Sequence, residues 1–167
     1  MDPKQARLFA RYNAWMNARL YELCAGIPDA ERKKDVGAFF KSIHGTLNHL
    51  LLGDRVWMGR FTAKPFAVTS LSQELYADFD ELRRARTELD VQIGAWAGSL
   101  TREALEGELR YRSIVNPADR TMPMWIAAAH FFNHQTHHRG QLTTLLMQRG
   151  IDPGATDLMW TPDAIPP

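Results

Sequence analysis

The sequence predicts an all-α protein, a four-helix bundle with a short hairpin or extended loop before its last long helix. Apolar residues recur at intervals of three and four along four long segments, which is the spacing of a helix face rather than of a strand. Glycine and proline separate these segments. With short connections, four such helices bury their apolar faces in an antiparallel bundle. A length of 167 residues fits one domain over 1–167.

The first helix is expected over residues 3–26. Asp2 is a candidate N-cap, and Pro3 occupies the first helical position, where a missing N–H costs nothing. Gly26 and then Pro28 end the segment, as expected just beyond a helix. Its apolar face consists of Leu8, Tyr12, Trp15, Met16, Leu20, Leu23 and Ile27.

The second helix is expected over residues 36–62 and ends before Pro65. Asp54 interrupts its apolar face, and we interpret this carboxylate as solvated or capping rather than as a partner of a buried site. Trp57 lies near enough to the middle of this helix to line a pocket there. The apolar positions are Phe40, Ile43, Leu47, Leu50, Trp57 and Phe61.

The third helix has the most regular pattern, extending for about thirty residues from Leu71 to Leu100. Ser70 or Ser72 can cap its start, with Glu74 in the first turn. The apolar positions between its ends are Leu75, Phe79, Leu82, Leu89, Ile93 and Trp96.

The helical spacing stops over residues 105–122. Residues 108–115 alternate loosely with period two, and residues 116–119 (NPAD) form a turn signal, which predicts a small hairpin or an extended loop. Pro123 then begins the fourth helix, which is expected to run to Gln148. The tail from residue 151 is rich in proline, glycine and aspartate, so we expect it to cover the bundle without regular structure.

Charge and composition indicate no polyanionic partner. Lys plus Arg is 20 and Asp plus Glu is 19, a net charge of +1, whereas nucleic-acid binding requires many phosphates to be neutralised. No apolar stretch approaches a membrane span, and the polar N-terminus does not resemble a signal peptide. The single cysteine, Cys24, lies on a helical apolar pattern and is expected to be a buried structural thiol. We therefore expect a cytoplasmic protein.

Two histidines of the fourth helix suggest a metal site. His134 and His138 are one helical turn apart on the same face, a spacing at which two imidazoles can bind one ion. A third ligand should then come from a facing helix, and His49 is placed to provide it. Gln135 stands where a zincin protease has its catalytic glutamate, so that class is not indicated.

Other histidines have simpler interpretations. His130 and His137 are expected to orient or hydrogen-bond the ligands, and His44 should point away from His49 because five residues separate them. The alternative for all of these side chains is the ordinary one, solvated or hydrogen-bonded histidines on an amphipathic helix. Spacing alone leaves both open.

The histidine run also carries a family resemblance. Residues 133–142, NHQTHHRGQL, resemble the NHxxHHRGQL signature of the DinB-like (DNA-damage-inducible) family of four-helix-bundle metalloenzymes. Residues 12–17 (YNAWMN) are similar to the family's first-helix pattern, and residues 42–49 followed by Asp54 and Trp57 are similar to its second-helix pattern. The resemblance spans nearly the whole chain. It implies an up-down-down-up bundle, often dimeric, with a three-histidine metal site.

Carried over residue by residue, the resemblance places the metal ligands at His49, His134 and His138. Three histidines leave a coordination position open, as in catalytic rather than structural sites. Imidazole ligands suit one divalent transition metal ion, zinc first, with nickel or iron as alternatives. No catalytic residue is assigned. Arg139 and Gln141 flank the site and could orient a substrate or serve packing.

Some relatives use a low-molecular-weight thiol in metal-dependent transfer reactions. The resemblance therefore implies a thiol-dependent S-transferase, with a low-molecular-weight thiol cosubstrate, and a homodimer. A metal-dependent hydrolase with water in the open position is the alternative enzyme. A non-catalytic stress protein that binds a metal or small ligand is the alternative outside enzymes.

Overall fold

The computed structural model describes residues 1–114 and 117–162, and this part of the chain is mostly helical with a small two-stranded sheet. None of its helices is long and apolar enough to span a bilayer. In chain order the elements are α1 (Pro3–Ala25), α2 (Asp29–Lys33), α3 (Ile43–Phe61), α4 (Phe79–Ser99), α5 (Arg102–Glu106), β1 (Glu108–Arg112), β2 (Asp119–Pro123), α6 (Met124–Met147) and the 3₁₀ turn η1 (Leu158–Trp160).

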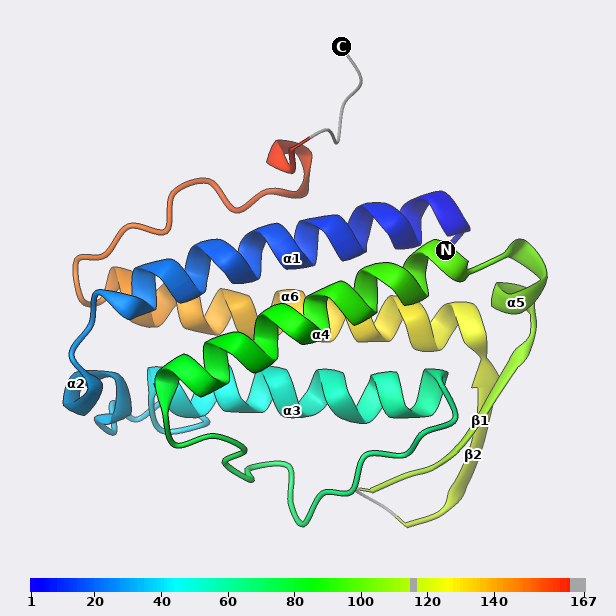
Figure 1. Ribbon diagram of the computed structural model, residues 1–167, viewed down its shortest axis with the longest axis horizontal. Coiled ribbons are helices and arrows are strands. Elements are labelled where there is room, and N and C mark those ends of the chain that lie inside the picture. The colour runs from blue at the N-terminus through cyan, green and yellow to red at the C-terminus, as the bar shows by residue number, and fades with distance from the viewer. Residues whose placement is uncertain (115–116, 163–167) are drawn as a thin grey trace.

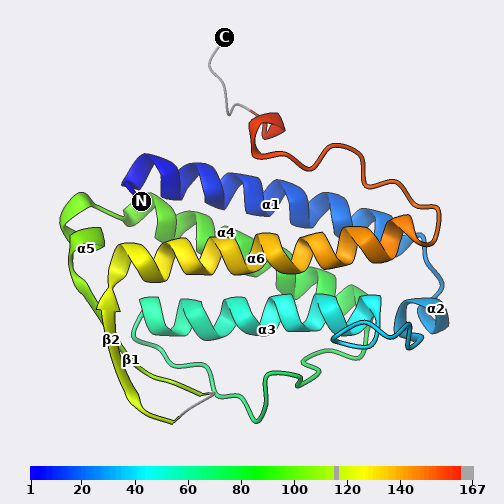
Figure 2. The same ribbon diagram turned by 180° about the vertical axis from the view of Figure 1, so that it is seen from behind.

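The long helices α1, α3, α4 and α6 lie side by side (Figures 1 and 2). Helices α1 and α6 run in one direction, whereas α3 and α4 run in the opposite one (Figure 1). Two consecutive helices that point the same way need a connection that returns along their length, and residues 62–78 provide it. The expectation of short connections throughout is therefore wrong at this point.

Helix α1 matches its prediction closely. The Asp2 carboxylate accepts a hydrogen bond from the Gln5 backbone N–H, and the Gln5 side chain accepts one from the Asp2 N–H, both at 2.8 Å. This reciprocal capping satisfies two backbone donors at the helix start. Cys24 is fully buried, and burial raises the pKa of its thiol to about 12. The prediction of a buried structural thiol is confirmed.

Helix α3 begins seven residues later than predicted. Gly37 and Lys41 have positive φ angles of 71° and 66°, so the backbone before the helix is folded into a loop. Ser42 then caps α3 by accepting a hydrogen bond from the Gly45 N–H at 3.0 Å. The apolar Phe40 belongs to this loop, although its spacing continues the helix pattern. A short helix, α2, precedes the loop and was not predicted.

Helix α4 begins at Phe79, and its cap is Asp78 rather than Ser70 or Ser72. The preceding segment is held to α3 instead of forming a helix. The backbone N–H groups of Leu75 and Tyr76 donate to the Asn48 side-chain oxygen at 2.8 and 3.0 Å. These contacts between distant residues override the local helical pattern.

The predicted hairpin is confirmed, with β1 and β2 antiparallel and Glu108 opposite Pro123. Val115 and Asn116, which belong to the predicted alternation and turn, lie outside the described residues. Pro123 ends β2 and is the N-cap of α6 rather than its first helical residue, so the helix begins one residue later than predicted. The short helix α5, just before the hairpin, was missed.

The tail lies along α1 (Figure 2). The Tyr12 hydroxyl donates to the Thr156 carbonyl at 2.6 Å, and Arg19 donates to the Ala155 carbonyl at 2.9 Å. Its irregular course was expected, except for the single turn η1.

A buried polar layer crosses the middle of the helices. Asp54 of α3 is fully buried and accepts a hydrogen bond from Arg86 of α4 at 2.6 Å. Arg86 also pairs with Asp90 at 2.9 Å, and Asp90 accepts from Asn13 and Asn17 of α1. Reading Asp54 as a solvated or capping carboxylate is therefore wrong, because this side chain is one half of a buried ion pair.

Candidate metal centre

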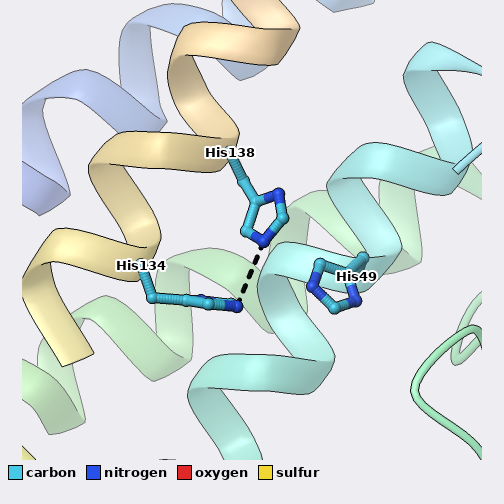
Figure 3. A group of neighbouring side chains, drawn as sticks. All are labelled: His49, His134 and His138. Carbon is cyan, nitrogen blue, oxygen red and sulfur yellow. Dashed lines mark hydrogen bonds between the residues drawn. The ribbon is translucent and has the colours of Figure 1, made fainter. Parts of the chain in front are cut away.

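The structure brings together the three histidines that the sequence singled out (Figure 3). His49 comes from α3, and His134 and His138 come from α6. One ring nitrogen of each lies within 4.8 Å of those of the other two. Among the residues that the structure describes, this is the only such group of histidine, cysteine or acidic side chains.

The two histidines of α6 face each other across one helical turn. Their Nε2 atoms are 3.1 Å apart (Figure 3). On its other side, the His138 ring has Nδ1 at 2.8 Å from the Gln141 side-chain oxygen. Since that oxygen accepts, Nδ1 carries the proton, and the lone pair of Nε2 is directed into the cluster.

His49 is oriented in the same way by a different element. Its Nδ1–H donates to the Leu71 carbonyl at 2.9 Å, which leaves the Nε2 lone pair free. Leu71 belongs to the 62–78 connection, so the irregular segment that replaces the predicted helix start holds this ring. The Phe40 ring stacks on the other side, with centroids 3.7 Å apart.

The position of the His134 ring depends on a glycine in the facing helix. A Cβ atom at Gly53 of α3 would lie 3.0 Å from Cε1 of the His134 ring, closer than real Cβ contacts normally come. Gly53 therefore makes room for His134 to approach α3. Gly53 was not singled out from the sequence, although it lies one helical turn after His49.

Burial keeps the three imidazoles neutral. It lowers the pKa of His49 to about 4, although the hydrogen bond to Leu71 opposes the shift. Burial and then repulsion from His138 lower the pKa of His134 to about 3. Burial also lowers the pKa of His138, against its hydrogen bond to Gln141. Neutral imidazole is the form that binds metals, so metal binding near neutral pH releases no net proton, although the proton between the two Nε2 atoms has to move to His134 Nδ1.

The donor set fits a divalent transition metal ion. Three imidazole nitrogens suit zinc, nickel, iron or copper, and their number leaves coordination positions open for other ligands. Gln141 and Leu71 hold the outer ring nitrogens of two histidines, as partners of metal-binding histidines commonly do.

Two cavities meet at His49. One, of about 230 Å³, extends from His49 and His134 toward the hairpin, and Trp57 lines it as expected. The other, of about 410 Å³, lies beside Phe40 and the N-terminal part of α3. The first cavity therefore reaches two histidines of the cluster, whereas the second reaches His49 alone. A cavity of about 630 Å³ between α3 and α4 is lined by none of the three histidines.

The remaining histidines lie outside the cluster. His44 donates to the Tyr76 carbonyl at 2.9 Å, which agrees with its predicted exclusion. The His130 ring lies 4.9 Å from Trp57 and 6.0 Å from His134 between centroids, with no hydrogen bond to a cluster ring among the described residues. His137 Nε2 lies 3.4 Å from the Gln141 amide nitrogen, so His137 is hydrogen-bonded to the cluster through Gln141 rather than directly. The direct hydrogen bonds to the cluster rings come from Gln141 and Leu71, which were not predicted in this role.

Arg139 serves packing rather than the cluster. Its side chain is buried, hydrogen-bonds Asn13 and lies over the Tyr12 ring at 5.0 Å from the centroid. Of the two residues that flank the histidines, Gln141 alone contacts one of them directly through a described hydrogen bond.

Comparisons with known proteins agree on one family. The family model described as DinB family matches residues 1–166. Protein DinB of Bacillus subtilis (strain 168) is 25% identical over an alignment of 152 residues, and the match covers 87% of this chain and 87% of that one. The crystal structure of a DinB-like protein from Bacillus cereus is similar with a TM-score of 0.58 and 17% identity, covering 84% of this chain and 89% of that one. The last likeness concerns the fold alone.

Proposed function

The chain belongs to the DinB family, and on that premise we propose that it is a metal-dependent enzyme with one divalent transition metal ion on His49, His134 and His138. The observation that carries the proposal is the convergence of three ring nitrogens from two helices, two of them with the opposite nitrogen hydrogen-bonded. Zinc is the metal we expect first, with nickel or iron next. In the same proposal, the four long helices form the family's up-down-down-up bundle.

For the reaction, we propose thiol-dependent S-transfer. A metal ion at this position would bind a thiol through an open coordination position and lower its pKa, and the thiolate is the nucleophile. The two cavities at His49 support a reaction of two molecules, because one borders His49 and His134 and a separate one borders His49. Phe40 and Trp57 would limit the access of water from those sides.

Cobalt substitution tests this reaction class. The metal-free full chain is loaded with Co²⁺, whose visible spectrum reports its ligands, and titrated with cysteine, glutathione and the matched alcohol serine. The proposal expects a thiolate-to-cobalt absorption band with a thiol and none with serine, and no band in the His134→Ala variant. It then expects an alkylating electrophile to be consumed faster by the thiol in the presence of the zinc-loaded protein than by the same thiol without protein.

The outcomes separate the candidates. Hydrolysis of ester or amide substrates without any thiol, lost in His134→Ala, would favour the hydrolase. Tight metal binding with no thiol band and no turnover would favour the binding protein.

A further inference from the structure

Arg60, in the last turn of α3, lines the 230 Å³ cavity that contains His49 and His134. Its guanidinium carbon lies 4.4 Å from the centroid of the Trp57 ring and 4.3 Å from that of Tyr111 in β1. Aromatic rings beside a guanidinium exclude water from its faces and leave the N–H groups at its edge to bind other groups. Arg60 is thus held in position at one wall of the cavity.

This cation has no carboxylate partner among the residues that the structure describes. The ion pairs there include Arg32, Arg86 and Arg149, but not Arg60. None of the described side chains lining the cavity is acidic. Burial also lowers the pKa of Arg60 from its ordinary value, a sign of partial desolvation, although a guanidinium stays charged at neutral pH. A partly desolvated, unpaired cation is stabilised by any anion that reaches it.

Arg60 and the histidines line different parts of the same cavity. His130 lies between them, since its ring contacts both Trp57 and His134. One part of the cavity wall therefore carries a fixed positive charge, and another part carries two imidazoles of the cluster, those of His49 and His134. A molecule that fills the cavity contacts both.

We infer that this cavity is a subsite for a small molecule that bears an oxyanion, a carboxylate or a phosphoryl group, bound by the Arg60 guanidinium. Both groups match the paired N–H donors of arginine. The volume is below the roughly 300–1,000 Å³ of pockets for drug-sized ligands, so the occupant is small. The inference deepens the proposed function, and for the reaction it rests on it, because the rest of the bound molecule would lie against the histidine cluster.

The test is calorimetric titration of the full chain with benzoate, phenylphosphonate and the neutral benzamide, in zinc-loaded and metal-free forms. Arg60→Gln removes the charge, and Arg60→Lys keeps the charge but loses the paired donors. The matched control is Arg55→Gln. Arg55 is also on α3 and also lies over aromatic rings, those of Phe66 and Tyr76, but it lines the separate 630 Å³ cavity.

We expect the better of the two anions to bind at least about tenfold more tightly than benzamide, in both metal forms, and its identity assigns the carboxylate or the phosphoryl group. Arg60→Gln should weaken that anion about tenfold or more, Arg60→Lys less, and Arg55→Gln not at all. Helical circular dichroism of each variant verifies that the fold is intact.

The inference would be overturned if benzamide bound the wild type as tightly as the better anion. It would also be overturned if Arg60→Gln bound that anion with unchanged affinity. Anion binding that requires zinc and ignores Arg60 would overturn it as well, because the anion would then be on the metal. If the chain retains no metal yet binds the anion through Arg60, the proposed function fails and the inference stands.

Discussion

At the scale of single residues, the histidine cluster depends on two hydrogen-bond partners, because the Gln141 side chain holds the outer nitrogen of His138 and the Leu71 carbonyl holds that of His49. The spacing of His134 and His138 is visible in the sequence because a helix repeats every turn. Gln141 lies one helical turn after His138 and was noted as flanking the site, but not as the hydrogen-bond partner of a ligand. Leu71 has no such signal, since it contributes only its backbone carbonyl. Asp54 was misread because its partner Arg86 is 32 residues away and on another helix.

Gly53→Ala tests whether close helix approach positions the cluster. The new methyl group would lie 3.0 Å from the His134 ring, so the ring must move. We expect metal affinity to fall about tenfold or more, while alanine's higher helix propensity keeps α3 folded. Competition with a chromogenic chelator measures the affinity.

Gly140→Ala is the matched control on α6, because a Cβ there meets nothing within 4 Å. It should leave metal affinity unchanged and stabilise the fold by up to about 1 kcal/mol. Unchanged metal affinity in Gly53→Ala would contradict the role assigned to Gly53.

The lowered histidine pKa values predict acid sensitivity of the metal-free protein. In the unfolded chain these histidines titrate at the ordinary value of 6.5, whereas His49 in the fold titrates at about 4. The unfolded state therefore binds more protons as the pH falls below 6.5, and the stabilisation present above 6.5 is lost toward pH 4. We expect a loss of roughly 1–2 kcal/mol from His49 between about pH 7 and pH 5.

Urea unfolding of the chelated protein at both pH values measures this change. His49→Phe should show a shallower pH dependence than the wild type, whatever its absolute stability. Identical slopes for the two proteins would show that the cluster does not hold His49 neutral.

At the scale of elements, the existence of the long helices and the hairpin was predictable from periodicity, but two helix starts were not. Residues 36–42 and 71–78 continue a helical apolar pattern, yet both are loops. Ser42 and Asp78 cap the true helix starts. The Asn48 side chain accepts hydrogen bonds from two backbone N–H groups of the second loop, which would otherwise need acceptors within a helix. Competition between local propensity and such distant partners cannot be read from spacing.

Asn48→Ala tests the link between the 62–78 connection and the cluster. It leaves the Leu75 and Tyr76 N–H groups without their acceptor, which should cost about 1–3 kcal/mol in the free energy of unfolding. Because the same connection carries the Leu71 carbonyl that orients His49, metal affinity should fall too. Chemical denaturation and the chelator competition measure the two effects. A loss of stability with no change in metal affinity would show that the 62–78 connection does not influence metal binding.

At the scale of the whole molecule, the fold positions the site by packing α3 against α6 in opposite directions (Figure 1). The parallel course of α3 and α4 forces a long connection past the site, and that connection supplies a hydrogen bond to His49. The family resemblance implied this topology, whereas periodicity alone favoured a simpler antiparallel order with short loops. Because the apolar core is large, we expect that folding does not depend on a metal.

We also expect a homodimer, as the family resemblance implies. Exposed apolar side chains such as Trp125 and Val91 are available for contacts between copies. Light scattering at micromolar concentration should give twice the chain mass of 19.0 kDa. A single-chain mass at that concentration would rule the dimer out.

Metal analysis of protein purified without a histidine tag tests the central claim most directly, with wild type and His49→Ala measured side by side. The account predicts about one divalent ion per chain in the wild type and its loss in the variant, with helical circular dichroism preserved in both. A wild type that retains no ion and takes none up on titration with zinc, nickel or iron would contradict it.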